Sequence, residues 1–145
     1  MPYKKNIVSA DIYDALNNCN TIETHVNGET LTHNSNSAEF DEILSQMDIM
    51  LTGSHEMPAF GVSLDNETKD AMKKGVWLKL IYDKTFVYNE MPFDSLLIQI
   101  EKDWTGFNIY RGNNGIYEGR CFYINLVDSD MSELYDIIIS YSENN

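Results

Sequence analysis

Histidine is the side chain with the widest range of chemistry in this sequence, and all three copies lie in the first half of the chain. His25, His33 and His55 fall within residues 6–68, a stretch with many acidic residues and no lysine or arginine. Imidazole and carboxylate groups together can hold a transition metal. The Asn27-Gly28 pair, however, predicts a tight hairpin that places His25 and His33 on opposite faces. We therefore expect no metal site and no cofactor.

An enzymatic alternative is a small hydrolase or a metal-dependent enzyme that uses His55 or Cys121. His55-Glu56 matches the start of a zincin motif, but Ala59 stands where that motif needs its second histidine. Ser54 precedes His55, yet neighbouring side chains point apart, and a catalytic triad is brought together by the fold. Cys121 is expected inside a strand, where a structural thiol is commoner than a nucleophile. No motif therefore favours catalysis.

The acidic residues are distributed unevenly along the chain. The 145 residues include 23 acidic and 10 basic side chains, for a net charge of −13. Residues 1–68 contain 11 acidic and two basic residues, and residues 121–145 contain five acidic residues and no base. Binding to nucleic acid or to an anionic membrane needs clustered lysine and arginine. We therefore expect no direct nucleic-acid binding and no membrane attachment.

Apolar residues at helical spacing predict the helices. The clearest helix covers residues 38–51, and its acidic side chains lie largely outside the apolar stripe. A short helix at 10–18 is expected to begin at Ser9 as N-cap, with a hydrophobic staple between Val8 and Tyr13.

Two further helices are predicted by capping signals. Asp65 is expected to cap a helix that continues to Lys74 and ends at Gly75. An Asp-x-x-Glu variant of the capping box at 130–133 precedes a C-terminal helix over 131–141.

Alternating apolar and polar residues predict the strands. Asn27-Gly28 favours a hairpin over 21–33, and residues 58–64 are expected to form a short strand. The turn at Gly112–Gly115 predicts a second hairpin in which Tyr110 lies opposite Tyr117. The remaining strands are expected at 76–82, 85–88, 95–102, 106–111 and 116–126.

These elements predict an α+β fold with an antiparallel four- to five-stranded meander sheet and helices packed mainly on one face. We expect one domain over residues 1–145. Its parts are an acidic helix and hairpin region (1–68), a sheet-forming region (76–126) and the C-terminal helix (131–141). Cys19 and Cys121 form no Cys-x-x-Cys unit, and no signal peptide is evident, so we expect reduced thiols and a cytoplasmic location.

If the helices at 38–51 and 131–141 cover one side of the sheet, their carboxylates would form a broad negative surface. Such a surface would attract and hold a basic protein, and this non-catalytic role is our leading hypothesis. Immunity proteins against nucleases, other inhibitors and DNA mimics share this charge and size. The alternative is that the acids only keep the domain soluble. The residues of the expected surface are Glu39, Asp41, Glu42, Asp48, Asp130, Glu133 and Asp136.

Tyrosines on the other face of the sheet provide a third hypothesis. Tyr110, Tyr117 and Tyr123 are expected to share that face with Asn108 and Asn125. Tyrosine combines a large apolar area with a polar tip, which suits interfaces and sugar-binding surfaces. Cross-strand aromatic pairs also simply stabilise sheets. An uncovered face of this kind would bind a ligand or a second copy of the chain.

Overall fold

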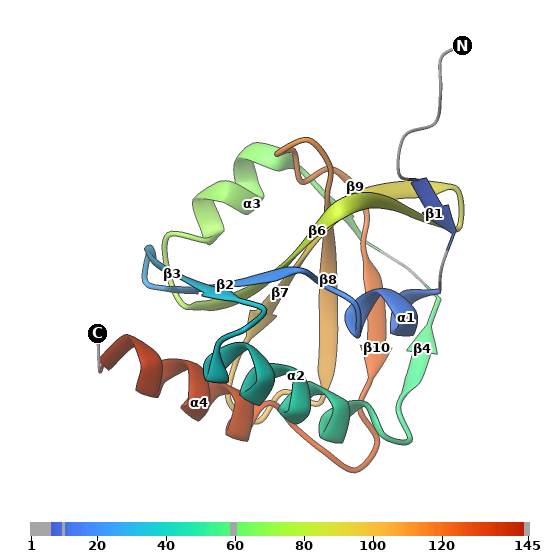
Figure 1. Ribbon diagram of the computed structural model, residues 1–145. Helices are drawn as coiled ribbons and strands as arrows, with labels where there is room; N and C mark the ends of the chain where they lie inside the picture. The colour runs from blue at the N-terminus through green and yellow to red at the C-terminus, as the bar shows by residue number, and fades with distance from the viewer. Residues whose placement is uncertain (1–6, 10, 59–60, 144–145) are drawn as a thin grey trace.

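The computed structural model describes residues 7–9, 11–58 and 61–143 (Figure 1). The helices are α1 (Ile12–Leu16), α2 (Ala38–Leu51), α3 (Asp65–Ala71) and α4 (Ser132–Glu143). The strands are β1 (Ile7–Ser9), β2 (Thr21–Val26), β3 (Glu29–Asn34), β4 (His55–Met57), β5 (Val62–Ser63), β6 (Val76–Tyr88), β7 (Met91–Ile100), β8 (Gly106–Gly112), β9 (Gly119–Arg120) and β10 (Phe122–Asn125). The α+β class predicted from the sequence is confirmed.

One large sheet organises the described residues. Its order is β3-β2-β6-β7-β8-β10-β4, all antiparallel, and β1 pairs in parallel with β6 to make eight strands. The expected meander is present as β6-β7-β8-β10. The sheet is wider than expected because the β2–β3 hairpin joins β6 and β4 joins β10. A second sheet consists of β5 and β9 alone.

The first hairpin has the predicted register. Val26 pairs with Glu29 and Ile22 with His33. Asn27 and Gly28 have φ values of 50° and 89°, the left-handed backbone that a two-residue hairpin turn needs. The Asn27 Oδ1 also accepts a hydrogen bond from the Gly75 backbone N–H at 2.9 Å, which ties the turn to the start of β6.

The last hairpin differs from its predicted register. Ile109 pairs with Phe122 of β10 rather than with Glu118, and an isolated bridge joins Asn113 to Ile116 at the turn, so Tyr110 does not lie opposite Tyr117. The reason is that residues 117–121 turn away from β8. The Tyr117 N–H donates to Asp65, and Gly119 and Arg120 form β9 against β5.

The predicted start of the first helix is wrong. Ser9 is a strand residue opposite Val87, and Val8 pairs with Phe86, so neither residue caps the helix. Asp11 is the N-cap instead, because its Oδ1 accepts the Asp14 N–H at 2.8 Å.

The middle of the chain also departs from prediction. Asp65 does not cap α3: Leu64 occupies the N-cap position, and the Asp65 carboxylate accepts the Tyr117 N–H at 2.8 Å. The hydrogen bond to this N–H lowers the pKa of Asp65, with a smaller contribution from Lys69. In place of one strand at 58–64 the structure has β4 and β5, with residues 59–60 outside the described part. The two strands expected at 76–82 and 85–88 are one strand, β6, with an irregular register between Ile81 and Phe86.

Helices cover the two faces of the sheet unequally. Figure 1 shows α2 and α4 on one side of the sheet and α3 on the other. The main core lies between the sheet and α1, α2 and α4, as predicted, and includes Phe93, Phe107 and Phe122. A smaller cluster on the outer face contains Trp77, Leu97 and Tyr117, with Met72 packed against it. None of the described helices has the length and apolar character needed to cross a membrane.

Candidate functional site

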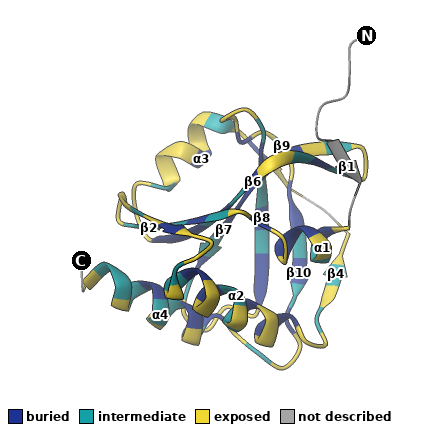
Figure 2. Ribbon diagram, in the orientation of Figure 1, coloured by how far each residue is buried: buried dark blue, intermediate teal, exposed yellow. Residues whose placement is uncertain are grey.

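Helices α2 and α4 lie side by side and carry six of the seven acidic residues singled out from the sequence (Figure 1). Four of them lie on α2 and two on α4, Asp130 precedes α4, and neither helix contains lysine or arginine. Of the seven predicted surface residues, Glu39 is half-buried and the other six are exposed. Figure 2 shows the exposed stripe that runs along the outer side of each helix. We call these seven residues, with Asp128, the acidic surface.

Contacts between α2 and α4 hold part of this surface in place. The Tyr141 hydroxyl on α4 donates a hydrogen bond to the Glu42 carboxylate on α2. Burial and this bond raise the pKa of Tyr141. The Tyr141 ring lies against the His33 ring, with 5.5 Å between the centroids. The two helices are therefore joined both to each other and to β3.

The acidic surface extends over α2 rather than ending at the groove between the helices. At 3.6 residues per turn, Asp41 and Asp48 lie about 100° or more around the helix from Glu42, and Glu42 is the residue that contacts α4. Both aspartates are exposed. The carboxylates of α2 therefore occupy both flanks of its solvent side.

The start of α4 adds further carboxylates. A hollow of about 470 Å³ between α2 and this segment is lined by Gln46 and Met50 on one side and by three acids on the other. These acids are Asp128, Asp130 and Glu133. Sequence analysis missed Asp128 because it precedes the predicted helix, although its acidic neighbourhood was a signal. Asp130 also accepts the Ser132 N–H at 2.9 Å.

One base borders the acidic surface within the described residues. Lys102 Nζ lies 3.1 Å from Asp136 Oδ1, and its ammonium group lies 5.7 Å from the centre of the Tyr135 ring. The bond to Asp136 raises the pKa of Lys102. Asp136 is therefore partly neutralised. Other described bases lie on or beside the outer face: Lys69 and Lys73 bind aspartates along α3, and Lys79 lies over the Tyr117 ring.

The three tyrosines of the outer face do not form one surface. Tyr117 is only 4% exposed, inside the cluster with Trp77 and Leu97. Tyr110 is half-buried and meets the edge of Trp77, with 5.8 Å between the ring centroids. Tyr123 lies apart from them on β10, opposite Asn108 of β8. Tyr110 and Tyr117 therefore serve packing under α3, and Tyr123 belongs to a separate region.

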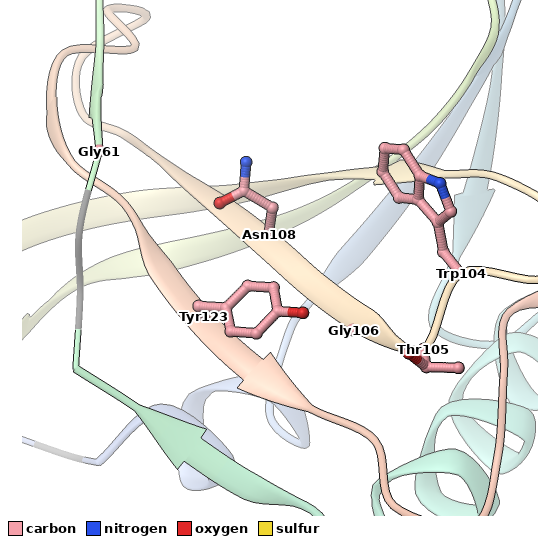
Figure 3. A pocket seen from close by; sticks show the side chains of 6 residues that line it. All are labelled: Gly61, Trp104, Thr105, Gly106, Asn108 and Tyr123. Atoms are coloured by element: carbon pink, nitrogen blue, oxygen red, sulfur yellow. The ribbon is translucent and has the colours of Figure 1, made fainter.

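Tyr123 and Asn108 line a hollow on the outer face. The cavity measures about 550 Å³ and lies over β8 and β10 (Figure 3). Trp104 and Thr105 form one end, and Gly61 approaches from the segment before β5. Asn108 and Tyr123 were singled out from the sequence, but Trp104 was missed because the turn before β8 has no recognisable motif.

The histidines do not converge on one point. His33 is buried, with Nε2 2.9 Å from the Thr24 hydroxyl. His25 lies on the opposite face of the hairpin, as predicted, between Glu23 at 3.1 Å and Thr30 at 3.0 Å. His55 is exposed on β4. Among the described residues, no group of three or more histidine, cysteine or acidic side chains is arranged to hold a metal ion.

The residues of the enzymatic hypothesis are also separated. Glu56 accepts a hydrogen bond from the Tyr88 hydroxyl at 2.7 Å, on the face of the sheet opposite to His55. Cys121 is buried, and burial raises the pKa of its thiol. A thiol that stays protonated is a poor nucleophile. Ser63 and Arg111 act on the Cys121 thiol in the opposite direction, but burial is the larger effect on its pKa.

Comparison with family models, curated proteins and solved structures gave no match to this chain. The function is therefore inferred from the placement of charge and from the geometry of the two surfaces described above.

Proposed function

We propose that this protein is a non-catalytic interaction protein that binds a basic protein through the acidic surface of α2 and α4. The observation that supports this proposal is the separation of charge in the fold. Carboxylates from residues 39–48 and 128–136 lie on two adjacent helices that contain no base and on the segment just before α4, and Lys102 at the edge pairs with Asp136. The lysines of α3 lie on the other side of the sheet.

This arrangement gives the surface a negative electrostatic potential. Carboxylates that lie within about 8–10 Å of each other act together at physiological salt. They attract a positively charged partner over that distance and increase its rate of association. Repulsion among these carboxylates destabilises the folded protein only to a limited extent, because they are solvated on exposed helix faces. If the acidic residues only kept the protein soluble, a surface of mixed positive and negative charges would do so equally well.

The proposed partner is a protein rather than a nucleic acid or a membrane, because both of those carry the same sign of charge as this surface. An inhibitor, an immunity-type protein or a DNA mimic would use such a surface in the same way. We place the protein in the cytoplasm, where Cys19 and Cys121, both buried and unpaired, would stay reduced.

Affinity capture from the native cell's lysate, at low and at high salt, tests this proposal. The surface variant is Asp41→Lys/Asp48→Lys/Glu133→Lys, chosen because these side chains are exposed and avoid the Tyr141 and Lys102 contacts. The matched control is Asp83→Lys/Glu90→Lys/Glu118→Lys, which changes the net charge equally at exposed positions outside α2 and α4.

Wild type and control should retain the same basic protein at low salt and release it at high salt. The surface variant should fail to retain it. Equal retention by both variants, or capture of acidic proteins only, would contradict the proposal.

A further inference from the structure

We propose a second binding site, for a neutral carbohydrate, in the outer-face cavity lined by Trp104, Thr105, Asn108 and Tyr123. The site borders the acidic surface at Thr105, which also lines the hollow with Asp128, Asp130 and Glu133. Its floor is distinct, because Asn108 and Tyr123 lie on the face of the sheet opposite to the core under α2 and α4. The proposal does not depend on the function proposed above.

The floor of the cavity is formed by a cross-strand pair beside a glycine. Asn108 of β8 and Tyr123 of β10 lie directly opposite each other, so their side chains share one face. Gly106 is two residues before Asn108 on β8 and therefore lies on the same face of the sheet. A Cβ placed on Gly106 would overlap the Tyr123 hydroxyl group. Glycine at this position therefore allows the Tyr123 ring to lie along the sheet towards Trp104 (Figure 3).

The rim of the cavity is held by backbone hydrogen bonds. The Trp104 carbonyl accepts the Met131 N–H at 2.9 Å, just before α4 begins. The Thr105 carbonyl accepts the Leu126 N–H at 2.8 Å, just after β10. Two successive residues are thus fixed to neighbouring segments, although the Trp104 side chain is 39% exposed. An exposed indole on a fixed backbone is preorganised to contact a ligand.

The lining residues indicate the class of ligand. They include two aromatic rings, an amide and a hydroxyl, and no charged side chain. Aromatic faces bind the apolar face of a ring, and the amide and hydroxyl groups exchange hydrogen bonds with hydroxyl groups. A sugar ring offers both. Phosphorylated ligands are disfavoured by the net charge of −13, and a purely apolar ligand would make no use of the amide of Asn108 or the hydroxyl of Thr105. The volume is typical of a small-molecule site.

The test is an NMR titration of the ¹⁵N-labelled full chain with maltotriose, cellotriose and triacetylchitotriose, and with adenosine and uridine as neutral aromatic alternatives. We expect at least one saccharide to shift the amide signals of residues 104–108 and 123 and the Trp104 indole signal. The buried Trp77 indole provides an internal reference, because its N–H is held by the Lys74 carbonyl at 2.9 Å.

Two variants test whether the saccharide binds in this cavity. Trp104→Ala and Asn108→Ala should each weaken saccharide binding at least tenfold, and Ile116→Ala, at an exposed apolar residue outside the cavity, should change it less than twofold. The amide spectrum of each variant shows whether it is folded. No shift with any saccharide, tighter binding of a nucleoside, or unchanged binding by a folded Trp104→Ala variant would overturn the proposal. The acidic-surface variant should bind the saccharide like the wild type, so the two proposals fail separately.

Discussion

At the scale of single residues, Tyr82 joins the first helix to the sheet. It is 5% exposed, and its hydroxyl donates to the Ala15 carbonyl at 2.6 Å. Burial raises the pKa of Tyr82 well above its usual value, so the hydroxyl remains a donor at neutral pH. The Ala15 carbonyl lies in the last turn of α1, where helical carbonyls need outside donors.

Tyr82→Phe should lower the free energy of unfolding by about 0.5–1.5 kcal/mol, because the Ala15 carbonyl loses its shorter hydrogen bond and keeps the one from the Asn18 N–H at 3.2 Å. Urea denaturation measures this change. Tyr135→Phe is the matched control, since the Tyr135 ring contacts Lys102 through its face and keeps that contact. Equal stability of the two variants would show that the Tyr82 hydrogen bond contributes nothing.

His33 makes the stability of the protein depend on pH. Burial lowers the pKa of His33 below its usual 6.5, against a smaller opposing effect of Glu39. The folded protein therefore binds this proton less readily than the unfolded chain does. The contribution to stability is complete above about pH 6.5 and is lost as the pH falls through the lower pKa of the folded state.

We expect the wild type to lose more stability than a His33→Gln variant between pH 7.5 and 5.5. Urea midpoints at the two pH values measure the difference, and His55→Gln, at an exposed histidine, is the control. A wild-type loss no greater than that of His33→Gln would contradict this assignment.

At the scale of elements, the β2–β3 turn is specified locally. Gly28 has a φ of 89°, and a Cβ there would lie 3.3 Å from the Lys73 carbonyl oxygen. Gly28→Ala should therefore lower the free energy of unfolding by about 1–2 kcal/mol. Gly28→Asn should lose less, because asparagine tolerates left-handed backbone better. Thermal unfolding of both variants tests this order, and a Gly28→Ala variant as stable as the wild type would refute it.

Local signals account for the elements that could be predicted. The turn at Asn27-Gly28 and the apolar stripe of residues 38–51 each depend on neighbours in sequence, and both were predicted correctly. The last hairpin was placed in the wrong register because Tyr117 and Asp65, 52 positions apart, hydrogen-bond to each other. Ser9 was mistaken for a cap because its pairing with Val87 could not be seen in the sequence.

The distinction between local signals and long-range contacts also applies to the two candidate sites. Helical spacing placed the acidic residues of α2 and α4 largely outside the apolar stripes of the two helices, whereas Asp128, which precedes α4, was missed. The cavity was not, because Trp104 and Tyr123 meet only through the pairing of β8 with β10 and the hydrogen bonds that fix the rim. Of the predicted tyrosine face, Asn108 and Tyr123 line the cavity.

At the scale of the whole molecule, the sheet separates two kinds of surface. The side covered by α2 and α4 is acidic, and the outer side carries the lysines of α3 and the uncharged cavity (Figure 1). Affinity at the acidic surface should fall as salt rises, whereas saccharide binding at the cavity should be insensitive to salt, because its lining has no charge.

The most direct test of the proposed function is the dissociation constant of the captured partner, measured at low salt for the wild type and the two charge variants. We expect Asp41→Lys/Asp48→Lys/Glu133→Lys to weaken binding at least a hundredfold and the control Asp83→Lys/Glu90→Lys/Glu118→Lys to weaken it less than fivefold, because a local surface matters more than net charge. Equal weakening by both variants would mean that net charge alone attracts the partner and would contradict a docking role for α2 and α4.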